Sequence, residues 1–415
     1  MSEPAQLPSF DESGNRERVA RLVECGVEVW GPERVYVGAD VPLENIQAGV
    51  VLMNAIITGK HSRIGAHSRI GISGNSTIHD CQIGEKVEIG AGLFHETTLL
   101  DGVKVRGFAE FREGTLLEEQ AEVGHSVGLK NTVLTIAVVA GSLINFCDVL
   151  MTGGTSRNDH SEIGSGTVHF NFDSHGDKFG SLLGDAVGLL LKSNRIFVGG
   201  NCGLVAPLHL DFGAVLAAGS TLRRDIAESQ LVHSREPERK PEPFDPDIYY
   251  DLRRKFLNTA RLIGAMIAMR AWYRMVRIPF ADRGRIALYG FADQRLATHI
   301  SHRANELEKV IVKLDRSLSK PAREGAVRQF EKQHRLLLAK KEEICSFLEE
   351  RQQSETSLPP DDFVEEYERQ RLTFRHADAL KNLTEANTKL AAGWIQNIAM
   401  EPVFKMENIF QQAQP

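Results

Sequence analysis

Residues 62–92, SRIGAHSRIGISGNSTIHDCQIGEKVEIGAG, decide the fold of this chain because an apolar residue followed by glycine returns every six positions. A six-residue period belongs to neither an α-helix nor an ordinary sheet. It is typical of a hexapeptide parallel β-helix, in which three short faces make one coil. The apolar residue is expected to point inward, and glycine to permit a tight corner with positive φ. The pairs are Ile64-Gly65, Ile70-Gly71, Ile83-Gly84 and Ile89-Gly90, then, in a looser register, Val123-Gly124 and Ile163-Gly164.

The composition divides the chain into four parts. Residues 1–25 are expected to form a disordered tail and a short amphipathic helix, and residues 26–235 the β-helix. Residues 236–247 hold four prolines among charges, which predicts a linker. Residues 248–415 are predicted to form an α-helical bundle or coiled-coil domain, because apolar residues return at spacings of three and four. The stretch 132–150 is so apolar that its coils are expected to bury both sides, against another chain or a helix.

Composition also argues against several classes of function. The net charge is −6 over 415 residues, so no nucleic-acid partner is expected. The five cysteines are scattered without a CxxC pair, which opposes a disulfide framework and favours a reducing, cytoplasmic location. His61 and His79 are spaced to stack on neighbouring coils, but two histidines without a third ligand make a poor site, so no metal is predicted.

No secretory signal or membrane-spanning segment is expected. The N-terminus is polar and acidic, unlike a signal peptide. The most apolar helical stretch, residues 257–279, contains four arginines, and its longest uncharged run is 262–269. A spanning helix needs about 20 apolar residues. An interfacial helix with an arginine face stays open as an alternative, although a membrane-surface partner is not expected.

Four segments, taken in order, carry a resemblance: GVEVWGPERVYVGADV (26–41), RGFAEFREGTLLEEQAEVGHSVGLKN (106–131), EIGSGTVHFNFDSHGDKFGSLLGD (162–185) and IFVGGNCGLVAPLHLDFGAVLAAGSTLRRDI (196–226). Residues 26–240 resemble the C-terminal acetyltransferase domain of the bifunctional N-acetylglucosamine-1-phosphate uridyltransferase/glucosamine-1-phosphate acetyltransferase family. The resemblance implies a left-handed β-helix and a homotrimer with active sites between neighbouring chains. It implies acetyl-CoA or another acyl-CoA as co-substrate and a small sugar-phosphate or nucleotide-sugar acceptor. The family's Gly-rich nucleotide-binding loop has no counterpart here, so uridylyl transfer is not expected.

The resemblance also implies binding residues. Arg112 falls at the family's phosphate-binding arginine, and Lys130 at its substrate-binding lysine. Taken alone, asparagine and aspartate are common in β-helix corners, where they bond the local backbone, and basic residues are commonly solvated. The further candidates are Asn171, Asp173 and Lys178 in the acetyl-transfer segment, and Gly200, Ala218 and Arg235 in the coenzyme-binding coils.

The family's basic histidine is missing from GSLINFCDVLMTGG (141–154), where Phe146 stands at the histidine and Val149 at a tyrosine. The acceptor amine must lose a proton as it attacks the thioester, and loss of a general base typically costs roughly 10² to 10⁴ in rate. His169 shares a strand face with Asn171 by alternation, although a structural corner histidine would satisfy the same pattern. The candidate bases nearby are Asp148, His160, His169 and His175.

Two functions therefore stay open. The first is an acyl-CoA-dependent N- or O-acyltransferase, favoured by the retained binding residues. The second is a catalytically inactive sugar-nucleotide-binding or trimerising scaffold, favoured by the missing histidine and tyrosine. Cys147 lies in an apolar run with no histidine beside it, so an inert thiol is expected rather than a nucleophile.

Overall fold

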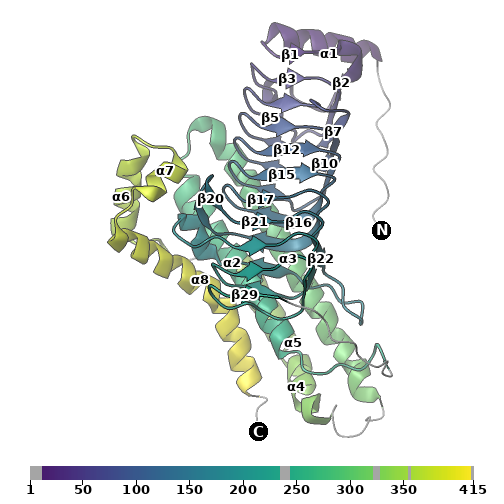
Figure 1. Cartoon of the computed structure of the whole chain (residues 1–415), viewed down its shortest axis with the longest axis vertical. Helices are drawn as coiled ribbons and strands as arrows, with labels where there is room; N and C mark the ends of the chain where they lie inside the picture. The colour runs from purple at the N-terminus through teal and green to yellow at the C-terminus, as the bar shows by residue number, and fades with distance from the viewer. Residues whose placement is uncertain (1–11, 234–243, 321–327, 354–356, 413–415) are drawn as a thin grey trace.

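The computed structural model describes residues 12–233, 244–320, 328–353 and 357–412. Its first half winds into a parallel β-solenoid of about 11 turns, the stacked coils of Figure 1, and helices follow from Arg253 onward. The predicted fold class, a left-handed parallel β-helix followed by an α-helical domain, is confirmed. The predicted tail at 1–11, Arg235 and residues 236–243 of the predicted linker lie outside the described residues.

Each coil has three sheet faces. The first face is an 11-stranded sheet, whereas the second and third are joined into one 16-stranded sheet because β16 (Gly128–Leu134) and β18 (Asn145–Met151) cross both. The first face comprises β1 (Glu28–Val29), β3 (Val51–Leu52), β6 (Arg69–Ile70), β9 (Glu88–Ile89), β12 (Lys104–Gly107), β15 (Glu122–His125), β17 (Val139–Ala140), β21 (Glu162–Ile163), β24 (Phe197–Val198), β27 (Val215–Leu216) and β29 (Leu231–Val232).

The other strands follow the same order along the axis. The second face adds β2 (Val35–Val37), β4 (Ala55–Thr58), β7 (Ser76–His79), β10 (Gly92–His95), β13 (Ala109–Phe111), β22 (Val168–Phe170), β25 (Gly203–Val205) and β28 (Thr221–Leu222). The third adds β5 (Arg63–Ile64), β8 (Gln82–Ile83), β11 (Thr98–Leu99), β14 (Leu116–Leu117), β23 (Ser181–Leu183) and β26 (His209–Leu210). A small antiparallel hairpin, β19 (Gly154–Ser156) and β20 (Asp159–His160), leaves the coil.

The six-residue period reflects the stacking of coils. Ile64, Ile83 and Leu99 take the same inward position on successive coils and are almost fully buried. Glycine follows Ile64 because a Cβ at Gly65 would lie 2.5 Å from the carbonyl oxygen of Gly84 on the next coil. Close approach between coils therefore requires glycine here, and the predicted positive φ does not occur at Gly65.

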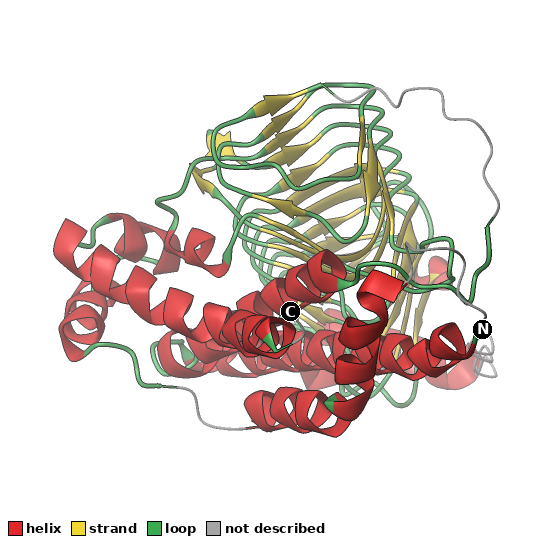
Figure 2. Cartoon of the chain, turned by 90° about the horizontal axis from the view of Figure 1, so that it is seen from below, coloured by secondary structure: helices red, strands yellow, loops and turns green. Residues whose placement is uncertain are grey.

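Helices cap the solenoid and cover one of its sides. The predicted short N-terminal helix is present as α1 (Glu12–Glu24), at the end of the solenoid in Figure 1. Figure 2 shows the C-terminal helices gathered along one side of the coils. They are α2 (Arg253–Trp272) with its π-helical extension η4 (Tyr273–Arg277), α3 (Arg283–Ser319), α4 (Arg328–Ala339), α5 (Lys341–Gln353), α6 (Asp361–Arg371), α7 (His376–Lys381) and α8 (Glu385–Gln411). Short 3₁₀ turns are η1 (Pro32–Arg34), η2 (Leu43–Asn45) and η3 (Ala186–Leu190).

The covered side is the third face. Its outward side chains Leu116, Val133 and Leu150 are fully buried and belong to the same apolar cluster as Leu262 and Met266 of α2. Burial of apolar surface on both sides of these coils stabilises the union of solenoid and helices. The expectation that residues 132–150 bury both sides is confirmed, and the covering elements are helices of the same chain.

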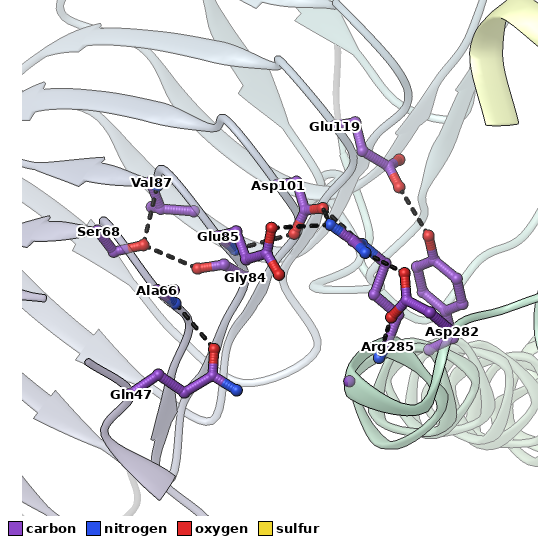
Figure 3. Close-up of polar contacts among 12 residues, drawn as sticks. Gln47, Ala66, Ser68, Gly84, Glu85, Val87, Asp101, Glu119, Asp282 and Arg285 are labelled. Carbon is purple, nitrogen blue, oxygen red and sulfur yellow. Dashed lines mark hydrogen bonds and ion pairs between the residues drawn. The ribbon is translucent and has the colours of Figure 1, made fainter. Parts of the chain in front are cut away.

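Ion pairs also fasten the helices to the corner that follows the third face. In Figure 3 the guanidinium of Arg285, at the start of α3, lies among the carboxylates of Glu85, Asp101 and Asp282. Further along, Arg277 is 2% exposed and pairs with Glu118 and with Glu119 of the solenoid. A buried cation is tolerated only with such partners. The helices are therefore fixed to the coils by charge pairs as well as by apolar contact.

Two of the four arginines in the most apolar helical stretch, Arg270 and Arg277, are buried inside the molecule. Arg270 is 7% exposed and donates to both carboxylate oxygens of Asp293 at 2.8 and 3.2 Å. In the part of the chain that the structure describes, no helix has the length and apolarity needed to cross a bilayer.

Candidate functional site

The corner between the second and third faces carries a line of side chains, one per coil, which we name the corner row: His79, His95, Arg112, Lys130 and Cys147. The strand registers pair His79 with His95 and Lys130 with Cys147, and Arg112 lies between them. The rings of His79 and His95 stack with centroids 5.0 Å apart. Adjacent strands lie about 4.8 Å apart, so Arg112 and Lys130, predicted from separate motifs, are immediate neighbours.

Charges are dense around these two cations. Lys130 pairs with Glu113, and although burial raises the pKa of Glu113, the hydrogen bond from Lys130 leaves that pKa below its usual range. Cys147 is half-buried, and burial, reinforced by Asp148, raises the pKa of its thiol despite the neighbouring Arg112 guanidinium. The thiol therefore stays protonated at neutral pH, which suits an inert role.

Asp148 lies directly beneath the corner row and is 1% exposed. Its carboxylate accepts from the Nδ2 atoms of Asn131 at 3.3 Å and Asn171 at 2.8 Å, and it lies 2.9 Å from Nη2 of Arg303. Burial raises the pKa of Asp148, but Arg303, the nearby His299 and the bond from Asn171 bring that pKa below its ordinary value. Asp148 is thus a fixed anion that joins two coils to α3.

His169 is 4% exposed, and its Nε2 lies 2.7 Å from Oγ of Ser181. Burial lowers the pKa of His169 to about 4, so the ring is neutral but out of contact with solvent. Phe146 is fully buried within the coil, 5.9 Å from the His169 ring. A side chain at position 146 points into the core, whereas the next residue, Cys147, points to the corner row.

The segment 171–179 folds back on itself beside the corner row, with a bridge between Phe172 and Lys178. The Lys178 ammonium lies over the Phe172 ring, 5.0 Å from its centroid. The Lys178 carbonyl accepts from Nη1 of Arg303 at 3.2 Å, which ties this segment to α3. Asp173 instead pairs with Lys255 of α2, and the Nε2–H group of His175 donates to the carbonyl of Ile248 at 2.9 Å.

The predicted site residues thus fall into separate groups. Arg112 and Lys130 are neighbours in the corner row, and Asp148 and His169 are buried beneath it, with Asn171 bonded to Asp148. Lys178 instead lies over the Phe172 ring, and Asp173 pairs with Lys255 of α2. Gly200 and Ala218 lie at the opposite edge of the second face, where the Gly219 N–H donates to the Gly200 carbonyl at 2.9 Å. His160 sits on the β19–β20 hairpin, away from both edges, with Nδ1 2.8 Å from the Arg157 carbonyl.

Sequence reasoning missed the contribution of α3 to this corner. Arg303 and His299 are fully buried against Asp148, and the half-buried His302 interacts electrostatically with Asp148 and Lys130. Burial lowers the pKa of His302, as does Arg303, so its imidazole is neutral at pH 7. The available sequence signal was the seam around Ile300, whose polar flanking positions face the solenoid.

No protein-family model matches the chain. Within the described ranges, no group of three or more His, Cys, Asp or Glu side chains is placed to hold a metal ion.

The buried histidines make stability depend on pH. His169 and His299 have pKa values lowered by burial to about 4 and about 3, below the ordinary 6.5. As pH falls below about 6.5, each of these histidines takes up a proton in the unfolded chain but not in the folded one. The free energy of unfolding therefore falls by about 1.4 kcal/mol per histidine and pH unit, until the folded-state pKa is reached. Urea unfolding between pH 7 and 4.5 should show this loss.

A single substitution isolates the effect from opposing groups such as Glu118, whose pKa burial raises. His169→Gln keeps a donor for Ser181 but does not titrate. We expect the variant to lose less stability than the native chain over the same range, by about 1.4 kcal/mol per pH unit. Parallel pH profiles of the two proteins would contradict a buried neutral His169.

Proposed function

We propose that this chain is a hexapeptide-repeat acyltransferase-like protein that binds an acyl-CoA and a phosphorylated sugar acceptor. The adjacent placement of Arg112 and Lys130 on neighbouring coils carries the proposal. Two cationic side chains on strands about 4.8 Å apart suit a phosphate, whose oxygens accept charge-assisted hydrogen bonds from both. Lys178 offers a further positive charge next to the exposed Phe172 ring.

The coenzyme is assigned to the later coils, along Gly200, Ala218 and Arg235, following the resemblance in the sequence. Gly200 and Ala218 lie across the second face from the corner row, so one chain does not bring the two binding regions together. Contact between the edges of two copies would do so, which supports the homotrimer implied by the resemblance. A reducing, cytoplasmic setting suits the five free cysteines.

A specific observation favours the second function, a catalytically inactive binding scaffold. Asp148 and His169 are buried, and Phe146 lies in the coil core, so these positions offer no base that an acceptor amine can reach. An active enzyme would need another base. The best candidate for this base is His302, whose neutral imidazole interacts electrostatically with Lys130.

The binding proposal is tested with glucosamine 1-phosphate as the probe, by calorimetric titration. Arg112→Ala and Lys130→Ala are each expected to weaken binding about 10- to 100-fold, because each removes a hydrogen bond from a charged group to phosphate. Lys104→Ala is the matched control, since Lys104 also pairs with a glutamate, Glu122, but on the first face. Equal losses in all three variants would contradict the assignment.

Release of the CoA thiol then separates the two functions. Transfer from acetyl-CoA to the bound probe would identify an enzyme. Binding of both compounds with no transfer beyond the buffer rate would identify the inactive scaffold.

A further inference from the structure

Two phenylalanine rings are exposed on the coil that follows the corner row and in the segment after it. Phe170 is 48% and Phe172 57% exposed, although burial of such a ring is favourable by about 1.5–3 kcal/mol. The register that pairs Asn145 with Val168 places Phe170 on the coil after Cys147, in line with the corner row. The row therefore continues from Arg112 and Lys130 to an aromatic ring.

Neighbouring groups hold both rings in place without burying them. Lys178 lies over the Phe172 ring, and this cation–π contact restrains it. The Phe170 ring lies against Gly203 of the next coil, where a Cβ would come within 3.3 Å of its Cε2 atom. Rings restrained in this way offer a face for stacking with little further loss of side-chain entropy.

The spacing of the coils sets the scale of a ligand that would use both ends of the row. Phe170 lies two coils from Lys130 and three from Arg112, or about 10 and about 14 Å along the axis. An isolated phosphate or sugar phosphate would engage only the cationic end. A ligand with phosphates at one end and a planar base at the other would engage both.

The geometry points to a nucleotide-linked sugar as the acceptor, and this inference rests on the proposed function. Its phosphates would bind Arg112 and Lys130, and its base would stack on Phe170 or Phe172. Stacking of a base on an aromatic side chain contributes enough to change affinity about 5- to 100-fold. Recognition would then depend on the nucleoside as well as on the phosphate.

Calorimetric titrations of the full chain with UDP, ADP and inorganic phosphate test the inference. We expect at least one nucleoside diphosphate to bind ten times more tightly than phosphate. Phe170→Leu or Phe172→Leu should weaken nucleotide binding at least fivefold and leave phosphate binding unchanged, because leucine keeps the apolar volume but has no aromatic face. Phe197→Leu is the matched control, since Phe197 is 37% exposed on the first face.

Each other outcome overturns the inference. If nucleotides bind no more tightly than phosphate, and binding still depends on Arg112, the proposed function stands and the stacking role of Phe170 and Phe172 is refuted. If neither the nucleotides nor phosphate bind, both the proposed function and the stacking role of the two rings are refuted. A leucine variant that changes the oligomeric mass in light scattering but not nucleotide affinity would assign the rings to a contact between copies.

Discussion

Arg303→Met is expected to destabilise the chain by about 3–5 kcal/mol, because it leaves the buried Asp148 carboxylate without its cation. Arg303 has no exposed surface and lies 2.9 Å from Asp148. Asn131 and Asn171 would still donate to that carboxylate, but neutral donors do not offset the desolvation of a full charge. The cost should appear as a lower urea midpoint, measured by far-ultraviolet circular dichroism.

A matched arginine separates this buried pair from the general effect of losing a charge. Arg335 of α4 pairs with Glu331 at 2.7 Å, but its side chain is 66% exposed. Exposed pairs typically contribute less than about 1 kcal/mol, so Arg335→Met should be nearly neutral. Adding Asp148→Asn to Arg303→Met should restore part of the lost stability, since no charge then stays buried. Similar effects of the two single arginine substitutions would refute a buried pair between solenoid and α3.

The solenoid itself was predictable because its determinants are local. The inward residue and the glycine that admits the next coil recur within each hexad, so they can be recognised without any distant contact. The apolar stretch 132–150 also predicted that one face of the solenoid is covered. Its partner was not predictable, because a helix and a second chain satisfy an apolar surface equally well.

The corner row shows why the candidate site was only partly predictable. Its successive members are separated by 16, 17, 18 and 17 residues, because corner loops differ in length from coil to coil. A fixed coil length of 18 residues therefore fails to bring His95 beside Arg112. Alignment by motif singled out Arg112 and Lys130 as separate candidates, but only the strand register shows that they are neighbours.

The burial of the predicted bases depends on contacts that no local pattern contains. Period-2 alternation predicts that His169 and Asn171 share a strand face, yet it does not say whether that face is open or covered. That is decided by α3, which begins more than 100 residues later and brings Arg303 against Asp148. The sequence does not show whether a charged residue beside an apolar helical seam faces solvent or pairs with a buried partner.

Gly264→Ala is expected to cost at least about 3 kcal/mol, although alanine normally favours a helix. Gly264 lies in α2 where it crosses α8, and a Cβ there would come within 1.9 Å of the Ala399 carbonyl oxygen. Backbone does not move aside as a flexible side chain can, so the two helices would have to separate. Gly290→Ala in α3 is the control, because nothing lies within 4 Å of its Cβ position and a gain of up to about 1 kcal/mol is expected. Urea unfolding of both variants gives the comparison. If Gly264→Ala were as stable as Gly290→Ala, the close contact between α2 and α8 at Gly264 would be refuted.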